Sequence, residues 1–115
     1  MKTKYIDGIS IIIPSYNRKN QLCRLLDSIQ KENLSYIHEI VVVDNDSDYD
    51  VIELLNKYSD TNIRVVRNSF NVRQGTNMMN TFLHCKTKWM WLISDDDEIC
   101  DGAIKIISKK IKKNR

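Results

Sequence analysis

The feature that most constrains this chain is a pair of short apolar runs that each end abruptly in polar residues. One is Ile9-Ser10-Ile11-Ile12-Ile13, stopped by Pro14, and the other is His38-Glu39-Ile40-Val41-Val42-Val43, which runs into Asp44. Short runs this rich in β-branched residues predict strands buried on both faces, as in a parallel sheet. The pattern therefore favours an α/β fold.

Segments with helical periodicity alternate with the apolar runs. Leu22, Leu25, Leu26 and Ile29 recur at helical spacing, and so do apolar residues within 51–58, 78–83 and 103–111. Further strands are predicted at Ile63–Arg67, near an edge because of its arginines, and at Trp89–Ile93. Four strands alternating with four helices predict a three-layer α/β/α domain, and right-handed crossovers give the strand order 3-2-1-4.

Composition places the chain among ordinary globular proteins. Its 115 residues fit a single domain, with 42% hydrophobic and 29% charged residues. No apolar run approaches the roughly 20 residues that span a bilayer. The three cysteines are odd in number and widely spaced, which argues against a disulfide framework or a zinc site. These features predict a cytoplasmic protein.

Basic charge is concentrated at the end of the chain. From Lys105 onward there are six basic residues and no acid, so the rest carries 12 basic against 15 acidic residues, a net charge of −3. Nucleic-acid binders spread their basic residues over a face, so no nucleic-acid partner is expected. The lysines of the final amphipathic helix are either a solvated face or a contact with an anionic membrane, which would place the protein at the inner face of the membrane.

The predicted topology brings three polar loops to one rim of the sheet. These are Pro14–Arg18, Asp44–Asp48 and Ser94–Glu98, and open α/β sheets bind ligands in such a crevice. The last loop carries four consecutive acids, whose repulsion must be relieved by solvent, protonation or a cation. A hard divalent ion shared with substrate phosphates would relieve it. The alternative is a solvated acidic turn before the next helix.

Glycine is too scarce for a backbone phosphate cradle, because the chain has three glycines and no P-loop. A metal bridge could hold a diphosphate instead. Asp44, placed directly after a strand, could accept a hydrogen bond from a base N–H such as the imide of uracil. For Asp44 and Asp46 the alternative is a tight turn with a helix cap. For Tyr16, Asn17 and Arg18 the alternatives are a packing aromatic, a turn residue and a solvated charge.

Three stretches carry a resemblance to a known family. They follow predicted strands in order: Ile11-Ile12-Ile13-Pro14-Ser15-Tyr16-Asn17-Arg18, Glu39-Ile40-Val41-Val42-Val43-Asp44-Asn45-Asp46-Ser47-Asp48 and Trp91-Leu92-Ile93-Ser94-Asp95-Asp96-Asp97-Glu98. Together they resemble the motifs of family 2 glycosyltransferases with the GT-A fold, a Rossmann-like architecture. The resemblance runs from Ile9 to about Ile107.

The resemblance implies an inverting transferase that uses a nucleotide-diphospho-sugar, typically a UDP-sugar, with Mg²⁺ or Mn²⁺. It also implies an acceptor that is a glycan or a lipid-linked glycan. By this similarity the nucleotide site includes Pro14, Tyr16, Asn17 and Arg18. Asp44 would contact the base, and Asp46 would help to close the pocket.

The acidic loop resembles the family's Asp-x-Asp metal motif. Asp95, Asp96 and Asp97 cover the metal and ribose site, although the leading Asp of the motif can also align with Ser94. The resemblance favours Asp97 as the main metal ligand with Asp95 beside it, and Asp96 at the ribose. Arg73 stands where the family often has glycine, and it either contacts a phosphate or lies in solvent.

The resemblance covers only the donor-binding part of such enzymes. The family's general base and acceptor site come from further along the chain, and no residue here can be assigned to that base. We therefore expect residues 1–115 to be a single truncated GT-A domain, inactive or nearly so alone. Its fourth strand would leave an apolar edge prone to pairing with a second copy, giving a homodimer.

Two alternative functions stay open. One is a non-catalytic nucleotide-sugar-binding subunit that needs a partner chain. The other is a phosphoacceptor signalling domain with an acidic Mg²⁺ pocket. The second alternative requires an acidic pair after the first strand, where this chain has Pro14-Ser15-Tyr16-Asn17.

Overall fold

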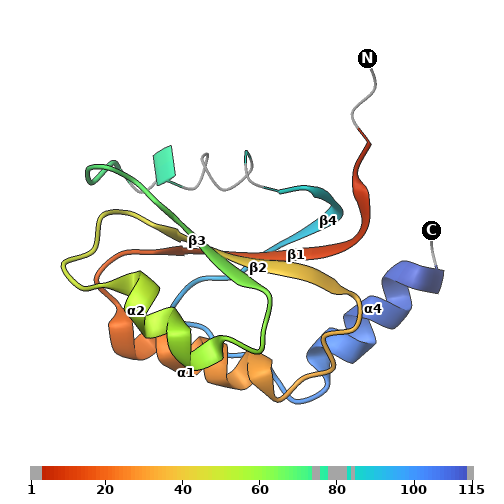
Figure 1. Ribbon diagram of the computed structural model, residues 1–115. Helices are drawn as coiled ribbons and strands as arrows, with labels where there is room; N and C mark the ends of the chain where they lie inside the picture. Colours follow the sequence, from red (N-terminus) through yellow and green to blue (C-terminus); the bar gives the residue numbers. More distant parts are fainter. Residues whose placement is uncertain (1–3, 74–75, 78–82, 84, 114–115) are drawn as a thin grey trace.

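The computed structural model describes residues 4–73, 76–77, 83 and 85–113, and these form an α/β domain around one parallel sheet (Figure 1). The sheet has four strands in the order β3-β2-β1-β4, which confirms the predicted 3-2-1-4 order. The strands are β1 Ile6–Ser15, β2 Ile37–Asp44, β3 Ile63–Arg67 and β4 Thr87–Leu92.

Strand β1 lies between β2 and β4 and pairs in parallel with both. Ile11 is opposite Ile40 of β2 and Trp91 of β4. Strand β3 lies at one edge of the sheet, as its arginines predicted. Arg64 of β3 forms a bidentate ion pair with Glu39 of β2. Because all strands run the same way, the loops that follow β1, β2 and β4 leave the sheet at the same rim.

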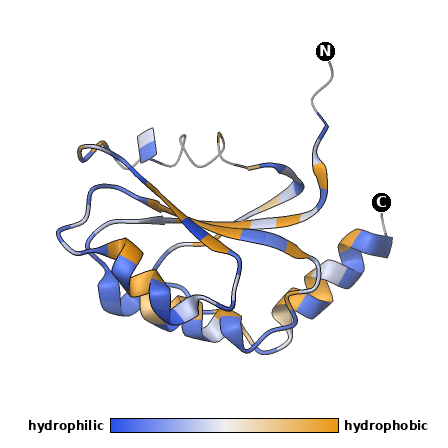
Figure 2. Cartoon of the chain, in the orientation of Figure 1, coloured by the Kyte–Doolittle hydropathy of each residue, from blue (hydrophilic) through white to orange (hydrophobic). Residues whose placement is uncertain are grey.

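The three helices in the described part of the chain cover one face of the sheet (Figure 1). They are α1 Lys19–Gln30, α2 Val51–Leu55, which continues as the short 3-10 helix η1 Asn56–Tyr58, and α4 Ala103–Lys113. Figure 2 shows that their apolar sides face the sheet while their polar sides face outward. The fully buried residues of α1 are the predicted stripe, Leu22, Leu25, Leu26 and Ile29.

Both faces of the central strands are buried. Ile11 and Val42 pack with the helices, whereas Ile12, Val41 and Val43 form a separate apolar cluster on the opposite face, all with 0% exposure. Burial on both faces is what the β-branched runs predict for a parallel sheet. The helix predicted at residues 78–83 lies, apart from Leu83, outside the described residues.

Side chains from neighbouring segments cap two of the helices. Asp50 precedes α2, and its side chain accepts a hydrogen bond from the Glu53 backbone N–H at 3.1 Å. The carboxylate of Glu32, just after α1, accepts from the backbone N–H groups of Gly102 and Ile104 at 3.1 and 3.2 Å. An acid at the positive end of a helix is favourable, so Glu32 ties the start of α4 to the end of α1. None of the described helices is long and apolar enough to cross a membrane.

Candidate functional site

A cavity of about 680 Å³ opens at the carboxyl rim of the sheet, where the predicted crevice was expected. Its size lies within the range of pockets that enclose small ligands. Four segments line it: the loops after β1, β2 and β4, and the segment that follows β3. The lining residues are Pro14, Ser15, Tyr16, Arg18, Asn45, Asn71, Val72, Arg73, Asn77, Leu92, Ser94, Asp95, Asp96 and Asp97.

Asn17 joins the loop after β1 to the loop after β2. Its backbone adopts a positive φ of 50°, a conformation that Asn tolerates better than most residues. Its side-chain amide donates to Asp48 at 3.0 Å and accepts from the Asp48 backbone N–H at 2.7 Å. Its own backbone N–H donates to the Ser47 hydroxyl at 2.8 Å. Asn17 is exposed and does not line the cavity; its contacts connect the two loops, and its predicted role in nucleotide binding stays a prediction.

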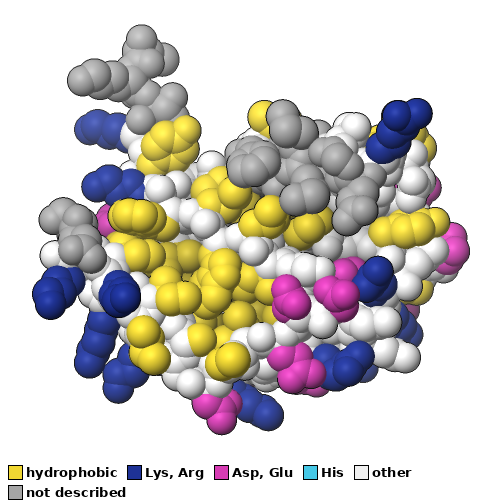
Figure 3. All heavy atoms as spheres, turned by 180° about the vertical axis from the view of Figure 1, so that it is seen from behind, with side chains coloured by type: hydrophobic (Ala, Val, Ile, Leu, Met, Phe, Trp, Pro, Cys, Tyr) yellow, Lys and Arg dark blue, Asp and Glu magenta, His cyan; other side chains and the backbone are white. Residues whose placement is uncertain are grey.

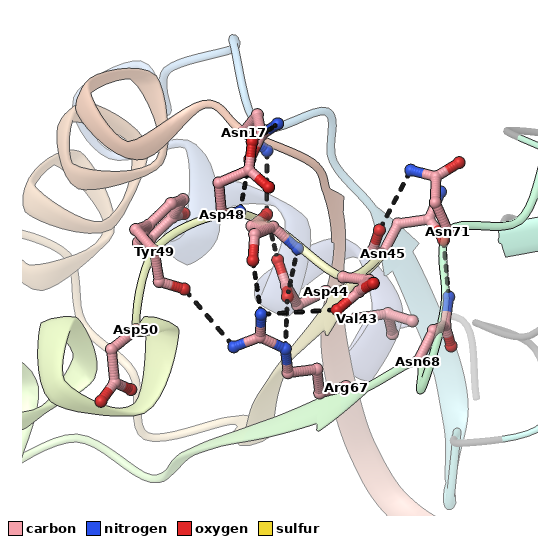
Figure 4. A network of polar contacts seen from close by, with 12 residues as sticks. Asn17, Val43, Asp44, Asn45, Asp48, Tyr49, Asp50, Arg67, Asn68 and Asn71 are labelled. Atoms are coloured by element: carbon pink, nitrogen blue, oxygen red, sulfur yellow. Dashed lines mark hydrogen bonds and ion pairs between the residues drawn. The ribbon is translucent and has the colours of Figure 1, made fainter.

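Arg67 braces the loop after β2 from the end of the edge strand β3 (Figure 4). Its guanidinium donates to the backbone carbonyl of Ser47 and, at 3.4 Å, to that of Tyr49. The same group lies 3.5 Å from the Asp44 carboxylate and 3.6 Å from that of Asp46. One cation therefore neutralises two acids and holds the loop that contains them.

Asp44 lies below the cavity rather than on its wall. Its side chain is 0% exposed, and its carboxylate accepts from the Ser47 hydroxyl at 2.5 Å and from the Ser47 backbone N–H at 3.0 Å. Asp46, with a positive φ of 64°, is likewise absent from the cavity lining. The predicted contacts of Asp44 with a base and of Asp46 with the pocket entrance stay predictions, and Asn45 is the residue of this loop that reaches the cavity.

Four asparagines shape the wall between β2 and the segment after β3, and the sequence analysis did not identify them. The side-chain amide of Asn45 pairs with the backbone of Val72, donating to its carbonyl at 2.7 Å and accepting from its N–H at 2.9 Å. Asn68 donates to Asn45 and Asn77 at 2.9 and 2.8 Å, and Asn71 donates to the Asn45 carbonyl at 3.2 Å. The recurrence of asparagine at positions 68, 71 and 77, after the third strand, was the sequence signal that could have identified them. Their network holds the segment at 71–73 against the cavity.

Asp95 is the buried member of the acidic loop. Its carboxylate accepts from the Ser15 hydroxyl at 3.0 Å and lies 3.8 Å from Arg18, and its side chain is 8% exposed. Burial raises the pKa of Asp95 above its usual value, against the opposing effects of the Ser15 hydrogen bond and the Arg18 charge. Asp95 thus connects the loop after β4 to the loop after β1.

Asp96 and Asp97 have different surroundings. Asp96 accepts from the Ser94 hydroxyl at 2.5 Å and from Arg18 at 3.1 Å, and the Ser94 hydrogen bond lowers its pKa. The Asp97 carboxylate makes no hydrogen bond or ion pair within the described part of the chain. Arg18 therefore neutralises Asp95 and Asp96, and the carboxylate of Asp97 is left exposed at the cavity.

The donor set at this rim fits a cation that shares its ligands with a substrate. Within the described residues, no group of three His, Cys, Asp or Glu side chains is arranged to hold a metal ion alone. Mg²⁺ is commonly held by one or two carboxylates together with substrate phosphates. Asp97 offers one exposed carboxylate of this kind on the cavity wall, whereas Asp95 and Asp96 are already paired with Arg18.

Comparison with models of protein families shows which family the chain belongs to. The model of glycosyl transferase family 2 matches residues 10–115. The chain belongs to this family. The loops after β1, β2 and β4 at the cavity lie in the three stretches that carried the resemblance in the sequence.

Curated relatives of this glycosyltransferase domain are longer proteins. An uncharacterized glycosyltransferase of Haemophilus influenzae is 30% identical over 105 residues, which are 88% of this chain and 35% of the relative. A GalNAc(5)-diNAcBac-PP-undecaprenol beta-1,3-glucosyltransferase of Campylobacter jejuni is 31% identical over 106 residues, 89% of this chain and 34% of the relative. The chain thus spans about a third of the length of these relatives.

Solved structures with the same fold include one in complex with UDP-GlcNAc and one mannosyltransferase. S. aureus TarS residues 1–349 in complex with UDP-GlcNAc matches with a TM-score of 0.82 at 24% identity, over 92% of this chain and 31% of TarS. The Pyrobaculum calidifontis mannosyltransferase PcManGT, in complex with GDP-Man and Mn²⁺, matches with a TM-score of 0.66 at 20% identity, over 84% of this chain and 29% of that one. These likenesses confirm the Rossmann-like GT-A architecture of the sheet.

Replacing Arg67 with Met tests the brace on the second loop. The substitution leaves the buried Asp44 carboxylate without its cation, and we expect the free energy of unfolding to fall by about 1–3 kcal/mol in urea denaturation. The matched control is Arg24→Met, because Arg24 is exposed on α1, and it should change stability by less than about 0.5 kcal/mol. An equal loss of stability in Arg67→Met and Arg24→Met would contradict the role of Arg67 in holding this loop.

Replacing Asp95 with Asn tests the burial of its carboxyl group. Because the pKa of Asp95 is raised in the folded state, ionisation of Asp95 costs stability once the pH rises above its ordinary value of 3.8. Asn cannot ionise, so the variant does not lose this stability as the pH rises. Its free energy of unfolding should therefore exceed that of the parent by more at pH 7 than at pH 4. Urea denaturation at both pH values measures the difference, with exposed Asp60→Asn as control. A gain that is the same at both pH values would show that burial does not raise this pKa.

Proposed function

We propose that this domain binds the nucleoside diphosphate of a UDP-sugar donor in the rim cavity, as the donor-binding part of an inverting glycosyltransferase. The observation that carries the proposal is the exposed carboxylate of Asp97 on the cavity wall, beside two acids that Arg18 already neutralises. The Asp97 carboxylate would repel a negatively charged ligand, so such a ligand needs a cation between itself and Asp97. The UDP-GlcNAc complex of TarS supports a UDP-sugar as that ligand.

Each side of the cavity would have a distinct task. Tyr16, 44% exposed at the rim, offers an aromatic face for a base, and Asn45 and Asn71 offer amide groups. Arg73 is one of the residues that line the cavity, so its guanidinium would be available to a phosphate bound there. Asp97 would hold Mg²⁺ or Mn²⁺ together with the phosphates of the donor. When bound, such an ion neutralises charge that develops on the departing nucleoside diphosphate.

We further propose that sugar transfer needs residues that this domain does not supply. Among the described residues, the carboxylates at the cavity offer no general base in this proposal, because Asp95 and Asp96 are paired with Arg18 and Asp97 would bind the cation. The acceptor would be a glycan or a lipid-linked glycan, as the name of the Campylobacter jejuni relative indicates for that enzyme. A donor-binding subunit that relies on a partner chain is the second candidate. Sugar transfer by the isolated chain would contradict both the need for further residues and the need for a partner chain.

Calorimetric titration of the chain with UDP, with and without Mn²⁺, tests the proposed function. We expect binding that requires the ion, is abolished by EDTA, and is weakened by more than about tenfold in Asp97→Ala, since each 1.4 kcal/mol of lost binding energy is a factor of ten. Asp60→Ala, which removes an exposed acid far from the cavity in sequence, is the control and should bind like the parent. UDP binding with the same affinity without Mn²⁺ and in Asp97→Ala would refute the assignment of Asp97 to the ion.

A further inference from the structure

A second, smaller cavity lies at the opposite end of the sheet, between α4 and the turn that precedes β2. Its volume is about 150 Å³, and it is lined by Asn33, Ser35, Lys105, Ser108, Lys109 and Lys112. Pockets that enclose drug-sized ligands measure roughly 300–1,000 Å³, so this one fits a single small group. The turn at residues 33–35 enters β2, whereas the rim cavity lies where the strands end, so the two sites are separate.

The lysines of this cavity form one stripe. Lys105, Lys109 and Lys112 are spaced i, i+4 and i+7, which places them on the same side of the helix. Figure 3 shows basic side chains gathered on the side of the molecule where α4 ends. No acid lines the cavity, and the nearby Glu32 carboxylate is occupied by the backbone at the start of α4. Like charges at this spacing repel, and a bound anion would relieve that repulsion.

Ser108 supplies a second, independent indication of a ligand. Its side chain is 8% exposed, and its hydroxyl has no hydrogen-bond partner in the structure. A buried hydroxyl without a partner is costly, and serine within a helix often avoids the cost by bonding to a carbonyl four residues back. Ser108 is one of the residues that line the cavity, together with the three lysines. An acceptor entering the cavity would satisfy its hydroxyl.

The surroundings of the cavity are held in place. The Lys112 ammonium lies 4.7 Å from the centre of the Tyr36 ring, a cation–π distance, and Asn33 accepts from the Ser35 backbone N–H at 3.0 Å. Glu32 ties the start of α4 to the same turn. The turn and the helix are therefore fixed relative to each other before any ligand binds.

We propose that this second cavity is a phosphate-binding site. Three lysines and a serine that line the cavity can all donate hydrogen bonds, no carboxylate is among the lining residues, and lysine is a common phosphate ligand. The phosphate is either that of an anionic lipid headgroup or a free phosphate group. The site is independent of donor binding at the rim, so its test does not depend on the proposed function.

Paired lysine substitutions in the full chain test the site. Lys105→Ala/Lys109→Ala removes two lining charges, and Lys110→Ala/Lys113→Ala removes two charges of the same helix that do not line the cavity. Binding is measured by sedimentation with vesicles of phosphatidylglycerol and phosphatidylcholine, and by NMR titration with inorganic phosphate. The first pair should weaken binding by about tenfold or more, and the second by less than about threefold.

The probes distinguish the source of the phosphate. Binding to phosphatidylglycerol vesicles but not to inorganic phosphate would identify a lipid headgroup, and binding to inorganic phosphate alone would identify a free phosphate group. Vesicles of phosphatidylcholine alone should not bind. Equal losses in the two lysine pairs would mean diffuse attraction to the helix and would overturn the site, as would the absence of binding to both probes.

Ser108→Ala separates a ligand contact from a structural role. Removing an unpartnered buried hydroxyl should leave thermal stability unchanged or raised. If the hydroxyl donates to the phosphate, affinity for the probe that binds should fall by roughly threefold or more although the fold is intact. Unchanged affinity in this variant would remove Ser108 from the site and, with it, the reason to place the phosphate in this cavity.

Discussion

The parallel pairing of β1 with β2 on one side and β4 on the other is the constraint on which the rest of this structure depends. The central strands are buried on both faces, so they cannot shift in register without exposing one of their apolar sets. Their common direction places three loops at one rim. The acids and Arg18 reach the cavity as a consequence of that arrangement, because they lie within a few residues of the ends of β1 and β4.

Charge balance at this rim determines which acid can act on a ligand. Arg67 enters from the edge strand and neutralises Asp44, while Arg18 comes from the loop after β1 and pairs with Asp95 and Asp96. Neither arginine pairs with Asp97. All three acids line the cavity, but Asp95 and Asp96 are paired with Arg18, whereas the carboxylate of Asp97 has no such partner in the described residues.

The sequence was sufficient for the strand order and the rim, because β-branched apolar runs and polar interruptions are local signals. It placed β3 at an edge from its arginines, yet it did not show that Arg67 braces the loop after β2, since that contact depends on how two loops pass each other. The amide of Asn45, which pairs with the Val72 backbone, was missed for the same reason. Asn17 was assigned to the nucleotide, whereas its visible contacts connect two loops.

The central claim is that the loops after β1, β2 and β4, with the segment after β3, form one ligand-binding surface. NMR mapping of UDP with Mg²⁺ on the isotope-labelled chain tests it most directly. The account predicts that shifted resonances fall at the rim, in residues 14–18, 45, 71–73 and 94–97, and leave α4 unaffected. Shifts confined to α4, or spread without relation to the rim, would contradict it.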